Sequence, residues 1–189
     1  ADGTIGNVFE IRCRLLGFKR RNDWQTLREY GGGVLNNTCP HFIDLLIQMV
    51  GARIEETYSD LKLVTNVGDA ENHVRIIMRG ENKRTADLLV SSVDAFPEPK
   101  WTLLGSNGTL VSDGKEAHIK SFADADLPPY EVRRGPSADR SYDFGGGIEF
   151  DERTEKVTAE IPHDLHDNIW MVLREGAAQD IILEDVREV

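Results

Sequence analysis

The chain has 189 residues, 40% apolar and 29% charged, which suits one globular domain with a substantial core. Its 22 basic and 33 acidic residues give a net charge of −11. This charge argues against binding nucleic acid or an anionic membrane surface, because both depend on Lys and Arg. No apolar run approaches the roughly 18 residues of a membrane span, and the first residues lack a signal-peptide pattern.

The two cysteines, Cys13 and Cys39, form neither a zinc pattern nor a disulfide framework. They predict free, buried thiols in a reducing compartment, which favours the cytoplasm. His163 and His166 are three positions apart but lack a third ligand at a telling distance, so no metal site is predicted.

Residues 4–17 alternate between apolar and polar and predict the first strand. In it, Phe9, Ile11 and Cys13 would share one face with Leu15. Residues 18–30 form a polar segment with one large aromatic side chain, Trp24.

Residues 31–50, GGGVLNNTCPHFIDLLIQMV, run from three glycines directly into a helix. Glycine has no Cβ, so backbone or ligand can approach it closely. The cap-type residues and Pro40 predict a helix that starts near Asn37, and this start places Asn37, His41 and Asp44 on one side of the first two turns. The helix N-terminus favours a neutral imidazole, which can accept a proton. The alternative, that His41 is structural, stays open.

The rest of the chain is rich in strand signals, followed by one further helical segment over residues 163–175. The predicted strands cover residues 53–66, 71–79, 85–93, 101–104, 109–112 and 116–122, with hairpin turns at Gly80–Lys83 and at GSNG. Residues 123–162 are either an exposed insertion or a loop over the site, and a strand-like IEF follows Gly147. The pattern predicts an α+β fold: a large open, mostly antiparallel sheet with helices on one face.

The segment GGGVLNNTCPHFIDLL resembles the part of the glucose-fructose oxidoreductase / inositol dehydrogenase (Gfo/Idh/MocA) family that follows the pattern GGG-x-L-x-D-x-G-x-H-x-x-D. The glycine triplet, Leu35, His41 and Asp44 are in register. Asn37 stands where the family usually has Asp, and Cys39 stands where it usually has Gly. KWTLLGSNGTLVSDG is similar to a hairpin of the same family.

The resemblance covers about residues 1–122 and 163–189. It implies that residues 1–189 are the single substrate-binding and oligomerisation domain, like the C-terminal domain of GAPDH, of an NAD- or NADP-dependent oxidoreductase acting on a sugar, polyol or related hydroxy compound. The N-terminal Rossmann domain would be absent from this chain, so the fragment alone would be inactive. The open sheet face, expected to be apolar, would call for a cover. The resemblance implies that a neighbouring subunit supplies it, giving a dimer or tetramer.

The resemblance also implies the roles of individual residues. His41 would be the catalytic proton acceptor. Substrate would contact Asn37, Asp44, Trp24 and Arg21, and the cofactor would lie near Gly31, Gly32 and Gly33. Asn37 can bind a hydroxyl group but cannot hold a negative charge. The alternative is a non-catalytic sugar-binding or assembly domain, with residues 18–30 as an exposed basic turn anchored by Trp24.

Overall fold

The computed structural model describes residues 3–127, 134–136, 147–158 and 165–179. The helices are α1 (Val34–Asn37), α2 (Cys39–Val50) and α3 (Leu165–Glu175), with short 3-10 helices η1 (Trp24–Thr26), η2 (Arg28–Tyr30) and η3 (Asp124–Asp126). The strands are β1 (Val8–Leu16), β2 (Ile54–Lys62), β3 (His73–Gly80), β4 (Thr85–Ser91), β5 (Trp101–Gly105), β6 (Gly108–Ser112), β7 (Glu116–Ser121) and β8 (Asp151–Lys156).

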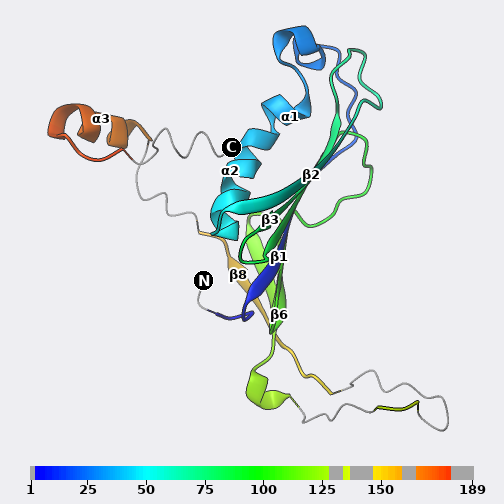
Figure 1. Ribbon diagram of the computed structural model, residues 1–189, viewed down its shortest axis with the longest axis vertical. Coiled ribbons are helices and arrows are strands. Elements are labelled where there is room, and N and C mark those ends of the chain that lie inside the picture. Colours follow the sequence, from blue (N-terminus) through cyan, green and yellow to red (C-terminus); the bar gives the residue numbers. More distant parts are fainter. Residues whose placement is uncertain (1–2, 128–133, 137–146, 159–164, 180–189) are drawn as a thin grey trace.

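All eight strands form one open sheet in the order β2-β3-β4-β1-β5-β6-β7-β8. Only β1 and β4 pair in parallel, and every other neighbouring pair is antiparallel. The helices α1 and α2 lie along one face of the sheet (Figure 1). This confirms the predicted α+β fold.

The core lies between α2 and the central strands β1, β3 and β4. Leu46 and Val50 of α2 are fully buried, as are Leu88 of β4 and both cysteines. Burial raises the pKa of the thiols of Cys13 and Cys39 to about 12. Both thiols therefore stay protonated and free, as predicted.

Two local predictions about strands are wrong. The pairing of β1 with β5 shifts register between Val8 and Glu10, so Val8 packs against the core and Phe9 is 48% exposed. The IEF segment (148–150) is not a strand. Ser121, the last residue of β7, pairs with Asp151, so β7 offers no ladder partner to the residues before Asp151.

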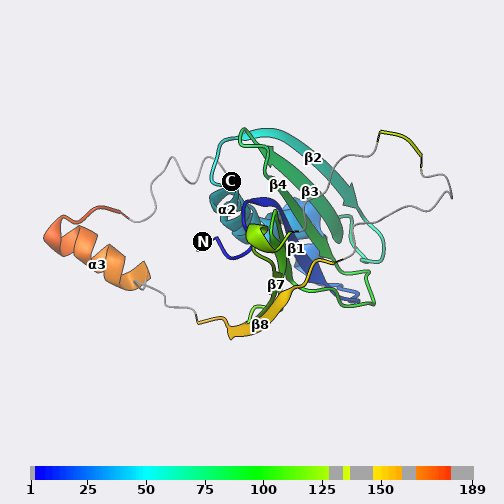
Figure 2. The same ribbon diagram turned by 90° about the horizontal axis from the view of Figure 1, so that it is seen from below.

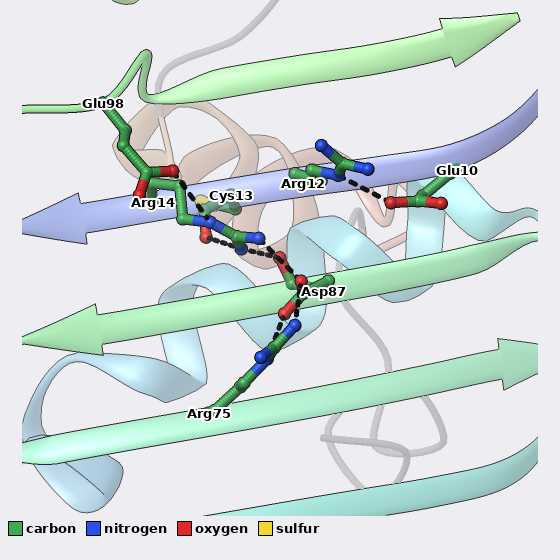
Figure 3. Close-up of polar contacts among 7 residues, drawn as sticks. All are labelled: Glu10, Arg12, Cys13, Arg14, Arg75, Asp87 and Glu98. Atoms are coloured by element: carbon green, nitrogen blue, oxygen red, sulfur yellow. Dashed lines mark hydrogen bonds and ion pairs between the residues drawn. The ribbon is translucent and has the colours of Figure 1, made fainter.

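The sheet face opposite α2, here called the far face, is not the apolar surface expected from the sequence. Its centre is mixed: Arg14 and Arg75 form ion pairs with Asp87 (Figure 3), in register with the apolar residues Ile77 and Leu89. Arg12 and Glu10 pair on the same face. Alternation placed these polar residues away from the core, and their mutual pairing lets the face remain open to solvent.

The helix α3 lies away from the sheet in both views (Figure 1, Figure 2). It begins at Leu165, and the first two residues of its predicted range lie outside the described residues. Half of residues 123–162, and the closing LEDVREV segment, also lie outside them. No helix in the described part of the chain combines the length and apolarity needed to cross a membrane.

Candidate functional site

A cavity of about 340 Å³ opens where the carboxyl ends of β1 and β4 meet. Because these two strands are parallel, both end at the same edge of the sheet, beside the start of α1. Open sheets often bind ligands beyond the carboxyl ends of their parallel strands. The cavity is lined by Leu15, Leu16, Gly17, Lys19, Arg21, Gln25, Gly33, Val34, Asn37, Thr38, Asn66, Glu71, Val90, Ser91 and Ser92.

The wall formed by residues 17–30 is held against the loop between β2 and β3 by backbone hydrogen bonds. Ala70 N donates to Thr26 O at 2.9 Å, and Arg28 N donates to the Asp69 carboxylate at 2.8 Å. Thr26 is buried, and its hydroxyl donates to the backbone oxygen of Asp23 at 2.8 Å. These bonds fix an irregular segment that periodicity could not describe.

The end of the glycine triplet is shaped by the buried carboxylate of Glu71. Gly33 has φ of +107°, and a Cβ there would lie 2.1 Å from Glu71 Oε1. The same oxygen accepts a hydrogen bond from Leu35 N at 3.0 Å. A Cβ on Gly32 would lie 2.5 Å from Gln25 O. Gly32 and Gly33 are therefore required by close packing within the protein.

Replacing Gly33 with Ala should lower the free energy of unfolding by at least about 2 kcal/mol, because it adds both positive-φ strain and a steric clash. Gly114→Ala is the control, since Gly114 has φ of +96° but open space around its missing Cβ. Urea unfolding of both variants checks this. Equal losses would show that the contact with Glu71 relaxes without cost.

The predicted single helix is two helices. α1 ends at Asn37, and α2 begins at Cys39 with Pro40 in its first turn. Thr38 separates them with φ of −114° and ψ of −43°. His41 is the third residue of α2 and is exposed. α2 thus begins two positions after the predicted start near Asn37, and the short helix α1 that precedes it was not predicted.

The polar groups of the predicted site have partners within the protein. Asn37 Nδ2 donates to Gln25 Oε1 at 3.2 Å, which joins α1 to the wall of the cavity. Gln48 Nε2 donates to Asp44 Oδ2 at 3.0 Å, one turn along α2. Asn37 is exposed and Asp44 is half-buried.

The cavity brings together part of the predicted set. Arg21, Asn37 and Gly33 line it. The other predicted residues are not among its lining residues: Trp24, His41, Asp44, Gly31 and Gly32. Trp24 is 59% exposed in η1. The sequence prediction missed Lys19, Gln25, Glu71 and Ser91; the basic run at 19–21 was a signal for Lys19.

The described residues contain no cluster of His, Cys, Asp and Glu suited to a metal ion. They also form no dinucleotide site, which needs a glycine-rich turn between a strand and a helix. Two 3-10 helices separate β1 from the glycine triplet, and Gln25 and Glu71 occupy the space beside Gly32 and Gly33.

Two solved structures illustrate the fold that this chain shares with known proteins. A crystal structure of an NAD-binding protein from Listeria innocua is 19% identical, with a TM-score of 0.72 over 98% of this chain and 54% of that one. An oxidoreductase from Bacillus cereus is 14% identical, with a TM-score of 0.68 over 98% of this chain and 53% of that one. The chain thus spans about half the length of these structures.

Among curated protein sequences, none matches the chain. The model of the GFO/IDH/MocA C-terminal domain matches residues 1–111, which include the whole glycine triplet, α1, α2 and the first six strands up to Val111. The chain therefore belongs to the Gfo/Idh/MocA C-terminal domain family.

Proposed function

We propose that the chain is the substrate-binding domain of an NAD- or NADP-dependent oxidoreductase that acts on a CH–OH group of a sugar, polyol or related hydroxy compound. The observation that carries this proposal is the cavity at the end of β1 and β4, which has polar side chains in its lining, with Asn37 in its wall four positions before His41. Family membership supplies the reaction class. Under this proposal, residues 1–189 form one domain, and an N-terminal Rossmann domain outside this chain binds most of the cofactor.

The residues of this chain would bind the substrate and move one proton. Asn37 and Arg21 offer amide and guanidinium groups to substrate oxygens. His41, exposed at the start of α2, would accept the proton of the reacting hydroxyl group. Asp44 and Trp24 would position the substrate from outside the cavity, and the glycine triplet would lie near the cofactor. The nicotinamide, when bound, would supply the hydride acceptor.

The test is hydride transfer by the intact protein against a panel of sugars and polyols, followed as NADH or NADPH formation. At least one hydroxy compound is expected to support turnover, whereas residues 1–189 alone are expected to support none. No turnover with any member of a broad panel, by protein that is folded and binds the cofactor, would contradict the proposal.

A non-catalytic sugar-binding or assembly domain is the second candidate. It is favoured by Asn37, which exchanges hydrogen bonds with Gln25 and has no charge to assist proton removal. The coding sequence upstream of residue 1 separates the two candidates. An in-frame Rossmann fingerprint supports the enzyme, and a stop codon followed by a start site supports the module.

The proposal also includes a homo-oligomer, a dimer or tetramer, and a cytoplasmic location. A dimer or tetramer through the far face would bury a charged surface whose ion pairs are already formed, including Arg14–Asp87. If light scattering at high protein concentration gives the molecular mass of a single chain, the proposed oligomer is contradicted. The two buried, reduced thiols favour the cytoplasm.

A further inference from the structure

The cavity carries an uneven distribution of charge in a protein that is strongly acidic. Two cationic side chains line it, Lys19 and Arg21, and both come from the segment that follows β1. Arg20, between them, does not line the cavity, and its Nε donates to the backbone oxygen of Thr65 at 3.2 Å. Two of the fifteen lining residues are basic and one is acidic, whereas in the whole chain acidic residues outnumber basic ones by 33 to 22.

Among the residues that the structure describes, Lys19 has no counter-ion. None of the ion pairs among the described residues involves its ammonium group. Arg21 is held by Asp23, whose Oδ2 accepts from Nη2 at 2.6 Å and from Nε at 3.3 Å. This contact fixes the guanidinium plane and leaves Nη1 available to a ligand.

The single carboxylate that lines the cavity is already engaged. Glu71 is 7% exposed, and its Oε1 accepts from Leu35 N at the start of α1. Its backbone oxygen accepts from Val34 N at 3.2 Å. Glu71 therefore stabilises the turn into α1, and nothing in the described residues ties it to Lys19.

The remaining lining suits a small hydroxylated compound. Leu15, Leu16, Val34 and Val90 supply apolar surface, and Ser91, Ser92 and Asn66 supply neutral hydrogen-bonding groups. A volume of about 340 Å³ is at the lower end for ligand pockets, which start near 300 Å³. It suits a monosaccharide-sized molecule better than a nucleotide sugar.

We propose that this cavity takes a small polyhydroxy compound with an anionic group, and that Lys19 and Arg21 bind the anion. The inference rests on the proposed function and narrows its substrate to sugar acids or sugar phosphates, which share a compact anionic oxygen group. Lys19 and Arg21 would then determine specificity, while the hydroxyl groups face Asn37 and the serines.

The experiment is calorimetric binding to the intact protein, measured with matched compounds: glucose, glucuronate and glucose 6-phosphate. At least one anionic compound should bind at least about tenfold more tightly than glucose, because hydrogen bonds to charged groups are the stronger ones. Lys19→Gln and Arg21→Gln should each remove most of this preference by weakening the binding of the anionic compound. Arg20→Gln, the matched control for lost charge, should keep the preference.

Comparing glucuronate with glucose 6-phosphate shows whether the carboxylate or the phosphate is preferred. High salt should weaken the binding of these two anionic compounds but not the binding of glucose. Equal affinity for glucose and both anionic compounds would overturn the inference, and so would a preference for the anionic compounds that survives Lys19→Gln and Arg21→Gln. In either case, turnover of neutral sugars would still uphold the proposed function. Binding of the anion at Lys19 without turnover of any panel member would uphold the inference and contradict the proposed function. If none of the three compounds binds, the inference is overturned.

Discussion

Replacing His41 with Ala in the intact protein is expected to slow hydride transfer at least about a hundredfold, since a general base contributes about 10²–10⁴ to the rate. The side chain is exposed at the third position of α2, so its removal leaves no buried cavity and should not unfold the domain. The loss should appear in kcat, because proton removal belongs to the transition state and not to ground-state binding. Steady-state kinetics with the best panel substrate measures this.

Two controls separate a catalytic from a structural role for His41. His118→Ala, on the far face of β7, should keep full activity, because its Nδ1 contacts only Thr154 at 2.9 Å in the described structure. Added imidazole should restore part of the activity of His41→Ala and have no effect on the wild type. A folded His41→Ala variant with full activity would show that His41 is structural, and the base would have to be sought elsewhere, including residues 123–162.

Much of the fold follows from local patterns. Alternation predicts the central strands, because a half-buried strand places every second side chain in the core. The hairpin between β3 and β4 was predicted from the turn residues Gly80–Lys83, and the structure has a tight turn there, in which Lys83 adopts a φ of +65°. The chain order of the strands did not reveal that β1 lies between β4 and β5, since that arrangement depends on contacts between distant segments.

The candidate site was only partly predictable for the same reason. Asn37 and Arg21 were identified from a motif and a nearby basic segment, and both line the cavity. Glu71 could not be linked to Gly33 from the sequence, because the two are 38 positions apart and are brought together by hydrogen bonds from Val34 N and Leu35 N to Glu71. The ion pairs of the far face could not be predicted, because Arg14, Arg75 and Asp87 lie on three different strands whose order depends on distant contacts.

Replacing Asp87 with Ala is expected to lower the free energy of unfolding at pH 7 by about 3–5 kcal/mol, the usual cost of removing one partner from a buried ion pair. The side chains of Asp87 and Arg14 are 8% and 10% exposed, and Asp87 Oδ2 lies 2.6 Å from Arg14 Nη2 (Figure 3). Arg75 adds bonds of 3.0 and 3.2 Å to the same carboxylate. Without Asp87, Glu98, at 3.6 Å, is the one ionic partner that the described part of the chain leaves to Arg14.

Ion pairs that are more exposed in the same sheet provide the controls for Asp87→Ala. Arg75 is 47% exposed, so Arg75→Ala should cost less than Arg14→Ala, because water can replace its partner. Glu152→Ala removes an exposed pair with Lys120 and should change stability by about 0–1 kcal/mol. Urea unfolding compares the variants. A loss below about 1 kcal/mol in Asp87→Ala would contradict the assigned role of this ion pair.

The pH dependence gives an independent check on Asp87. Burial alone would raise the pKa of this carboxyl group, but hydrogen bonds from Arg14 and Arg75 outweigh it and hold the pKa below its ordinary value of 3.8. The stabilisation is therefore complete above the unfolded pKa and is lost as the pH falls through the lower folded pKa. The difference in stability between the wild type and Asp87→Ala should stay constant from pH 7 to about pH 5 and shrink below pH 4. A difference that persists unchanged in acid would show that lost packing, rather than the charge of Asp87, causes the destabilisation.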